Sequence, residues 1–109
     1  MNIIKLWVDD TRTPPSDEWV WAKSVNEAQA AIRFYERNMS DDQILISLDH
    51  DAGAYYSSGG DYIKVLDYLE EWKIPDTGYS FHLHTMNPVG RENMRRIINR
   101  NNWREVKSI

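Results

Sequence analysis

Short apolar runs alternate with amphipathic segments along this chain, and this alternation constrains the fold more than any other feature of the sequence. Three amphipathic segments carry apolar residues at helical spacing. Five runs rich in β-branched and aromatic residues are predicted strands: residues 2–8, 19–22, 44–48, 79–84 and 103–106. Strands that alternate with helices are typical of a parallel sheet with helices on both faces. We therefore predict an α/β fold of three layers, with a five-stranded, mostly parallel sheet and about three helices.

Each predicted helix begins at a recognisable capping residue. Ser24 forms a capping box with the glutamate three residues later, and its helix is expected to run to Asn38. Asp61 is the expected cap of the second helix. Asn87 is the expected cap of the third, and Pro88 follows at the first helical position, where an amide hydrogen is not needed.

Two long connections are predicted to lack regular structure. Residues 11–18 contain Pro14 and Pro15, which cannot donate to a sheet or to a helix interior. Residues 51–60 contain three glycines, and we expect this segment to be flexible. Pro75 is expected to end the second helix.

The composition is that of one small domain spanning residues 1–109, and it excludes several kinds of chemistry. Hydrophobic residues make up 41% of the chain, which is enough to build a core. The net charge of −4 disfavours sequence-independent binding to duplex DNA. The absence of cysteine excludes disulfides, thiolate metal sites and thiol nucleophiles. No apolar run is long enough to span a membrane and no signal peptide is recognisable, so we expect a cytoplasmic protein. The oligomeric state is not indicated.

Polar and ionisable side chains follow three of the predicted strands. In a parallel sheet covered by helices, ligands bind beyond the carboxyl ends of the strands. The side chains at these ends are Asp9 and Asp10 after the first strand, Asp49, His50 and Asp51 after the third, and His84, Thr85 and Asn87 around the end of the fourth. If these strands are neighbours, we expect the side chains to converge on one site.

The three carboxylates Asp9, Asp10 and Asp49 can form a site for a hard cation. Carboxylates that lie close together repel one another, and a bound Mg²⁺ or Mn²⁺ relieves that repulsion. The alternative is structural: Asp9 caps the loop that follows it, and Asp10 pairs with Arg12.

Histidines near the same edge can transfer protons. Phosphoester cleavage needs one group to accept a proton from the attacking oxygen and another to donate to the leaving oxygen, and His50 and His84 suit these roles. His82 and His84 are two residues apart on a strand, so they should face the same side. The alternatives are a buried His82 that hydrogen-bonds to backbone, and a His50 that is an exposed loop residue.

The start of the third predicted helix is a candidate site for a phosphate. Free amides in the first turn, after Asn87, attract anions with help from the helix dipole. Arg91 can add a two-pronged contact to a phosphate, and Thr85 lies on the approach to the helix. The alternative for Arg91 is a surface salt bridge with Glu92 or Asp67, which contributes little.

These residues resemble the receiver domain of two-component response regulators. The resemblance implies that Asp9 and Asp10 bind Mg²⁺, that Asp49 accepts a phosphoryl group and that Thr85 contacts it. The chain departs from receivers in having a proline-containing loop, and no helix, between the first two predicted strands.

A closer resemblance is to the receiver-derived family of cyclic-phosphate-processing domains. Three ordered motifs carry it: residues 6–14 (LWVDDTRTP), residues 48–53 (LDHDAG) and residues 84–94 (HTMNPVGRENM). The resemblance implies a receiver-like (flavodoxin-like) fold and a phosphoesterase that acts on cyclic phosphate, such as a 2′,3′-cyclic phosphate on an RNA end or a nucleotide.

Three functions are therefore considered. The first is a metal-assisted hydrolase. In it Asp9 and Asp10 hold the cation, and Asp49 either joins them or orients a water molecule. His50 and His84 exchange protons, and the phosphoryl oxygens are held by Thr85, Asn87 and Arg91. The second is a stand-alone receiver phosphorylated on Asp49. The third is a non-catalytic module that binds a phosphate ligand or a protein.

Overall fold

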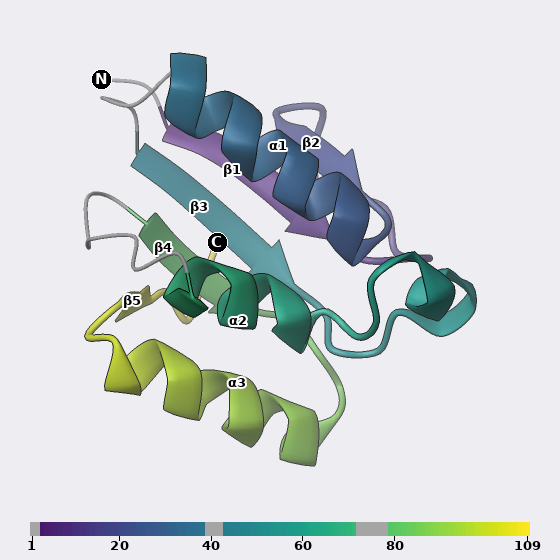
Figure 1. Cartoon of the computed structure of the whole chain (residues 1–109), viewed down its shortest axis with the longest axis vertical. Coiled ribbons are helices and arrows are strands. Elements are labelled where there is room, and N and C mark those ends of the chain that lie inside the picture. Colours follow the sequence, from purple (N-terminus) through teal and green to yellow (C-terminus); the bar gives the residue numbers. More distant parts are fainter. Residues whose placement is uncertain (1–2, 39–42, 72–78) are drawn as a thin grey trace.

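Five parallel strands form one sheet in the order β2-β1-β3-β4-β5 (Figure 1). The computed structural model describes residues 3–38, 43–71 and 79–109. In it the strands are β1 (Ile3–Val8), β2 (Trp19–Ala22), β3 (Gln43–Leu48), β4 (Tyr79–Leu83) and β5 (Arg104–Glu105). Every described strand pair is parallel. The predicted five-stranded α/β fold is therefore confirmed, although β5 is shorter than expected.

The three helices, α1 (Val25–Asn38), α2 (Ile63–Glu71) and α3 (Pro88–Arg100), lie on the same side of the sheet (Figure 1). The expectation of helices on both faces, and so of three layers, was wrong. The three helical connections, β2 to β3, β3 to β4 and β4 to β5, all step across the sheet in one direction, and a right-handed connection then places each helix on one face. The step from β1 to β2 runs the other way, and residues 9–18 cross it without a helix.

The hydrophobic core lies between the sheet and the helical layer. Alternate strand residues such as Leu6, Ile46 and Phe81 are fully buried and pack with helix residues such as Ile32 and Leu66. Each such side chain contributes roughly 1.5–3 kcal/mol on burial. Because side chains alternate along a strand, the residues between these core positions face the opposite side of the sheet.

Aromatic side chains line the sheet face that none of the described helices covers. The rings of Trp7 and Trp19 meet edge to face with centroids 5.6 Å apart, and both side chains are buried. The Trp7 indole donates a hydrogen bond to the Arg12 carbonyl (2.9 Å). The loop between β1 and β2 is thus anchored to Trp7 on this face of the sheet. In a three-layer fold a helix would cover the same face.

Two of the three predicted caps are confirmed. The Ser24 hydroxyl accepts a hydrogen bond from the Glu27 amide (3.1 Å), and the Asn87 side chain accepts one from the Gly90 amide (3.0 Å). Pro88 is the first residue of α3, as expected.

The segment between β3 and α2 differs from the prediction. The Asp61 carboxylate accepts a hydrogen bond from the Ala52 amide (3.0 Å), so it closes the preceding segment across nine residues instead of capping α2. The segment expected to be flexible contains a 3₁₀ helix, η1 (Gly53–Ser58). Pro75 lies outside the described residues.

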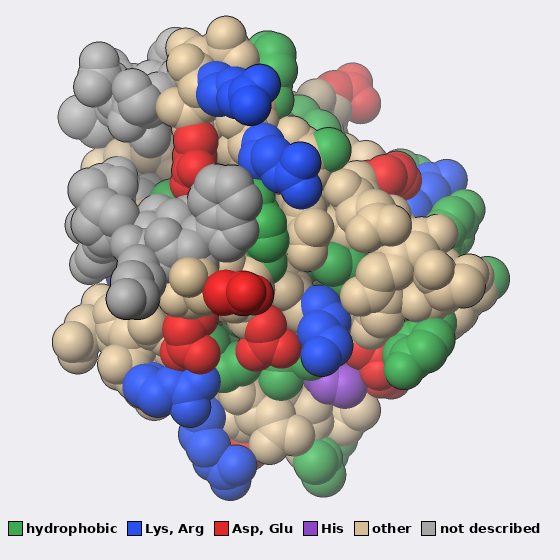
Figure 2. All heavy atoms as spheres, viewed as in Figure 1, with side chains coloured by type: hydrophobic (Ala, Val, Ile, Leu, Met, Phe, Trp, Pro, Cys, Tyr) green, Lys and Arg blue, Asp and Glu red, His purple; other side chains and the backbone are tan. Residues whose placement is uncertain are grey.

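Charges of both signs are interspersed over the surface in the view that shows the helices (Figure 2). Arg95 and Arg100 of α3 are paired with Glu105 and Glu70, at 2.8 Å in each case. These arginines of the C-terminal helix are therefore neutralised by neighbouring carboxylates. No helix in the described part of the chain is long and apolar enough to cross a membrane.

Candidate functional site

The three predicted carboxylates lie together because β1 and β3 are neighbours that end in register. Val8 pairs with Leu48, and the Asp49 amide donates to the Val8 carbonyl (3.0 Å). One carboxylate oxygen from each of Asp9, Asp10 and Asp49 lies within 4.8 Å of the other two. The oxygen donors and their spacing fit a hard divalent cation such as Mg²⁺ or Mn²⁺.

Hydrogen bonds stabilise the carboxylate of Asp9 as an anion. Its side chain is fully buried, and Oδ1 accepts hydrogen bonds from the amides of Thr11 (2.9 Å) and Arg12 (3.0 Å). Oδ2 lies 2.9 Å from Nε2 of His84. Burial alone raises the pKa of Asp9, but these hydrogen bonds outweigh it and lower the pKa. The loop-capping role considered for Asp9 is thus present, and it leaves about one lone pair free for a cation.

Asp10 has the opposite electrostatic environment. Partial burial, together with the charges of Asp9 and Asp49, raises the pKa of Asp10. Arg12 does not relieve this repulsion in the described structure, because its guanidinium donates to the His84 carbonyl (3.0 Å). The pairing of Asp10 with Arg12 that we had considered is therefore absent from the described hydrogen bonds and ion pairs.

Gly53 allows the chain to pass close to this cluster. It has a left-handed backbone (φ 55°), and a Cβ atom at this position would overlap Oδ2 of Asp10. The glycine in the second motif is therefore explained by its contact with a candidate cation ligand.

His84 is buried behind the carboxylates and both of its ring nitrogens have partners. Its Nδ1 lies 2.7 Å from the Ser47 hydroxyl, and its Nε2 contacts Asp9. The ring stacks on Trp7 with centroids 3.9 Å apart and planes 4° from parallel. Burial lowers the pKa of His84 even though the contact with Asp9 opposes this effect.

His82 shares the sheet face of His84, as its spacing predicted. Its Nδ1 lies 2.9 Å from the same Ser47 hydroxyl. Burial, with a contribution from His84, lowers the pKa of His82. Its partner is thus a side chain and not the backbone group considered earlier.

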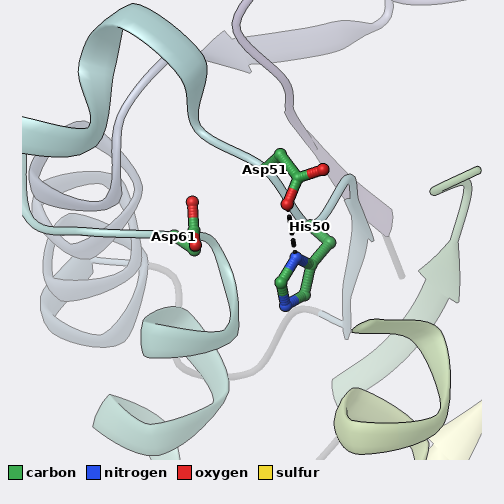
Figure 3. A group of neighbouring side chains, drawn as sticks. All are labelled: His50, Asp51 and Asp61. Carbon is green, nitrogen blue, oxygen red and sulfur yellow. Dashed lines mark hydrogen bonds and ion pairs between the residues drawn. The ribbon is translucent and has the colours of Figure 1, made fainter. Parts of the chain in front are cut away.

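His50 lies against the start of α3. Its Nδ1 is 2.8 Å from Oδ1 of Asp51, and Asp61 approaches the same pair from the segment that leads into α2 (Figure 3). A Cβ atom at Gly90 would overlap the His50 ring, so helix and imidazole are in close contact. None of the described residues hydrogen-bonds to Nε2 of His50.

An open cavity of about 440 Å³ lies beside the carboxylate cluster. It is lined by Arg12, Asp49, Asp51, Thr85, Met86, Asn87 and Pro88. Thr85 is almost fully buried, and its hydroxyl accepts from the Asn87 amide (3.1 Å). The cavity therefore joins a candidate cation ligand, Asp49, to the start of α3.

Arg91 and Arg12 occupy different places from those expected. Arg91 donates to the Thr85 carbonyl and does not line the cavity; its buried Nε has no described partner. Arg12, which we considered only as a partner for Asp10, lines the cavity. The only sequence signal for a role of Arg12 at the cavity was its position two residues after Asp10. Ser47 was likewise missed; its only signal was that a polar residue stands between the apolar Ile46 and Leu48 of β3.

One family model matches the chain. Its description is cyclic-phosphate processing receiver domain, and the match covers residues 4–100. Neither a curated protein nor a solved structure matches the chain significantly. The matched range includes all the residues of the carboxylate cluster and of the cavity.

Proposed function

Because the chain belongs to the cyclic-phosphate processing receiver domain family, we propose that it is a metal-assisted phosphoesterase that hydrolyses a cyclic phosphate. The favoured substrate is a 2′,3′-cyclic phosphate on an RNA end or a nucleotide. The observation that carries the proposal is the shared position of Asp49, which belongs to the carboxylate cluster and also lines the cavity. A phosphate in the cavity would therefore lie beside the cation ligands.

Asp10 and Asp49, with the remaining lone pair of Asp9, would hold the Mg²⁺ or Mn²⁺ ion. When bound, the cation would neutralise negative charge that develops on the phosphoryl oxygens. The raised pKa of Asp10 supports this assignment, because the burial and the neighbouring carboxylates that raise it both disfavour an uncompensated negative charge, which a cation would balance.

His50 is the proposed proton-transfer group. Its Nδ1 donates to Asp51 in the tautomer that leaves Nε2 as an acceptor. In the proposed reaction, the oxygen of a water molecule forms a bond to phosphorus and its proton passes to Nε2. The bond from phosphorus to one ribose oxygen breaks on the opposite side, that oxygen takes a proton from solvent water, and His50 returns its own proton to solvent.

His84 has a different role in this proposal from the one first expected. Its two nitrogens are engaged by Asp9 and Ser47, and only 7% of its side chain is exposed. We therefore assign it to holding Asp9 in place, and not to direct proton transfer.

The start of α3 and Arg12 form the proposed phosphate contact. Arg12 lines the cavity, and Thr85 and Asn87 line it near the first turn of a 13-residue helix. The positive end of the α3 dipole and an arginine favour a dianionic transition state over the singly charged cyclic ester. Arg91 would support this contact indirectly, through its hydrogen bond to the Thr85 carbonyl.

The test is to incubate the protein with 2′,3′-cyclic AMP and with a short RNA ending in a 2′,3′-cyclic phosphate, and to follow both by mass spectrometry. The proposal predicts a product heavier by one water in the presence of Mg²⁺ or Mn²⁺, and its loss in Asp49→Asn and His50→Ala. Asp67→Asn, which removes a carboxylate from the exposed face of α2, is the matched control and should retain activity. Unchanged masses for both substrates would contradict the proposal.

A second candidate function is a receiver phosphorylated on Asp49, and the same geometry favours it, since Asp49 lies between the acidic pair and Thr85 across the cavity. This function predicts a stable fluoroberyllate complex with Mg²⁺ that Asp49→Asn abolishes, without hydrolysis of cyclic phosphate.

A non-catalytic module would instead bind the cyclic nucleotide and release it unchanged.

A further inference from the structure

Ser47 joins two histidines in a chain of hydrogen bonds that crosses three neighbouring strands. His82 on β4 lies 2.9 Å from the Ser47 hydroxyl on β3, and Nδ1 of His84 lies 2.7 Å from the same oxygen. Nε2 of His84 lies 2.9 Å from Oδ2 of Asp9, directly after β1. We propose that Ser47 is a positioning residue, which together with Asp9 holds the ring orientation in which Nε2 of His84 donates to Asp9, and which sets the tautomer of His82.

The hydrogen-bonding capacity of the four groups permits one arrangement when both imidazoles are neutral. The carboxylate of Asp9 can only accept, so Nε2 of His84 carries the hydrogen. Nδ1 of His84 is then an acceptor and must receive the single hydrogen of the Ser47 hydroxyl. The Ser47 oxygen consequently accepts from Nδ1 of His82, which places the hydrogen of His82 on Nδ1 and leaves its Nε2 bare.

Packing alone cannot select this arrangement. Trp7 stacks on His84 and fixes the plane of the ring. A half-turn of the imidazole keeps the same plane, but it puts carbon atoms where Nδ1 and Nε2 had been. The Ser47 hydroxyl and the Asp9 carboxylate both discriminate between these two orientations, because each bonds a ring nitrogen and gains nothing from a carbon.

The burial of Ser47 also points to this role. Its side chain is completely buried in a strand whose neighbouring residues are apolar, and the two histidines are the hydroxyl's only described partners. A buried hydroxyl without partners destabilises the fold, whereas alanine would fit the same space at no such cost. The hydroxyl is therefore explained by the order that it imposes on the imidazoles.

The consequence for cation binding rests on the proposed function, because it requires Asp9 to face a cation. Groups that orient a metal ligand from behind typically change metal affinity by about 10–100-fold when they are removed. We expect Ser47→Ala to weaken binding of Mn²⁺ by about ten-fold, at the lower end of that range, because Asp9 keeps its two backbone hydrogen bonds.

The experiment is long-range ¹H–¹⁵N NMR of the imidazoles in the full chain at neutral pH, with Mn²⁺ affinity measured in parallel. In the wild type, the hydrogen should reside on Nε2 of His84 and on Nδ1 of His82. Ser47→Ala should return His82 to the Nε2–H form and weaken Mn²⁺ binding, and Ser47→Thr, which restores the hydroxyl, should recover both. His82→Ala should leave the His84 tautomer intact, since Ser47 keeps its hydrogen for Nδ1.

A wild-type His82 in the Nε2–H form would overturn the assignment of Ser47, as would a Ser47→Ala protein in which the two tautomers are unchanged. The two tautomers are observed by NMR without any need for enzymatic activity or for a bound metal. If the wild type fails to bind Mn²⁺ while the tautomers are as expected, the cation part of the proposed function fails and the positioning by Ser47 stands.

Discussion

Asp9 and Asp10 are consecutive residues, yet the structure shifts their pKa values in opposite directions. Hydrogen bonds from Thr11, Arg12 and His84 lower the pKa of Asp9, while partial burial and neighbouring carboxylates raise that of Asp10. One carboxylate is thus held as an anion by the protein itself, and the other has no equivalent support. This difference is what a cation-binding pair requires, because the unsupported charge gains most from the cation.

Asp10→Asn is expected to stabilise the metal-free protein at neutral pH. A raised carboxyl pKa means that the charged form disfavours folding, and this cost is present above the unfolded pKa near 3.8 and disappears as Asp10 is protonated at lower pH. A relief on the order of 1 kcal/mol corresponds to a rise of about 4–8 °C in Tm for a domain of this size. Thermal unfolding in EDTA measures it, with Asp67→Asn as the control.

The same variant should lose the response to metal. Mg²⁺ that binds only the folded wild-type protein raises its Tm with increasing concentration. Asp10→Asn should show no such rise. Equal responses of the two proteins would place the cation elsewhere.

Gly90→Ala should displace His50 while the fold is retained. Alanine favours a helix over glycine by about 1 kcal/mol, but its Cβ would overlap the imidazole. If His50 transfers the proton, kcat should fall by about 10²-fold or more. Val89→Ala changes an exposed neighbour in the same turn and should leave kcat unchanged. Normal activity of Gly90→Ala would exclude His50 as the proton-transfer group.

Arg12→Lys should impair phosphate recognition without disturbing the cation. Lysine keeps the charge, but it cannot both donate to the His84 carbonyl and present a flat pair of donors to the cavity. We expect kcat/KM for a cyclic nucleotide to fall by about ten-fold or more, which corresponds to roughly 1.4 kcal/mol. Mn²⁺ affinity should remain that of the wild type. A parallel loss of Mn²⁺ binding would mean that Arg12 organises the carboxylates and not the phosphate.

The pairing of Glu105 with Arg95 should make stability depend on pH in the acidic range. Glu105 accepts two hydrogen bonds from Arg95, each 2.8 Å, and one from Lys107, and these contacts lower the pKa of Glu105. A lowered carboxyl pKa contributes stability above the unfolded value near 4.5, and that contribution is lost as pH falls through the folded value. Glu105→Gln should therefore be less stable by about 1–2 kcal/mol at pH 7 in urea unfolding. The difference from wild type should vanish in strong acid, and a constant difference would contradict this account.

Local signals in the sequence predicted much of the fold. Ser24 and Asn87 were recognised as caps because a cap and its amide partner are three residues apart, so the signal is contained in one turn. Asp61 carried a similar local signal, but its carboxylate bonds the amide of Ala52 across a loop, and sequence spacing does not reveal such a partner. The one-sided helical layer depends on strand order and on the handedness of each connection, which are properties of the whole sheet.

The site was predicted where its residues end adjacent strands, and missed where contacts pass between strands. Asp9, Asp10 and Asp49 came together because neighbouring parallel strands end at one edge. The contact of Ser47 with both histidines depends on the register of β3 with β4, where Ser47 lies beside His82. A single serine in an apolar run carries no sign of that pairing.

The most direct test of the account is a ³¹P NMR time course of 2′,3′-cyclic AMP with the wild-type protein, first in Mg²⁺ or Mn²⁺ and then in EDTA. The account predicts that the cyclic-phosphate signal is replaced by that of a 2′- or 3′-monophosphate only when the metal is present, and that Asp49→Asn abolishes the conversion. A cyclic-phosphate signal that persists unchanged with metal, or one that disappears equally fast in EDTA, would contradict it.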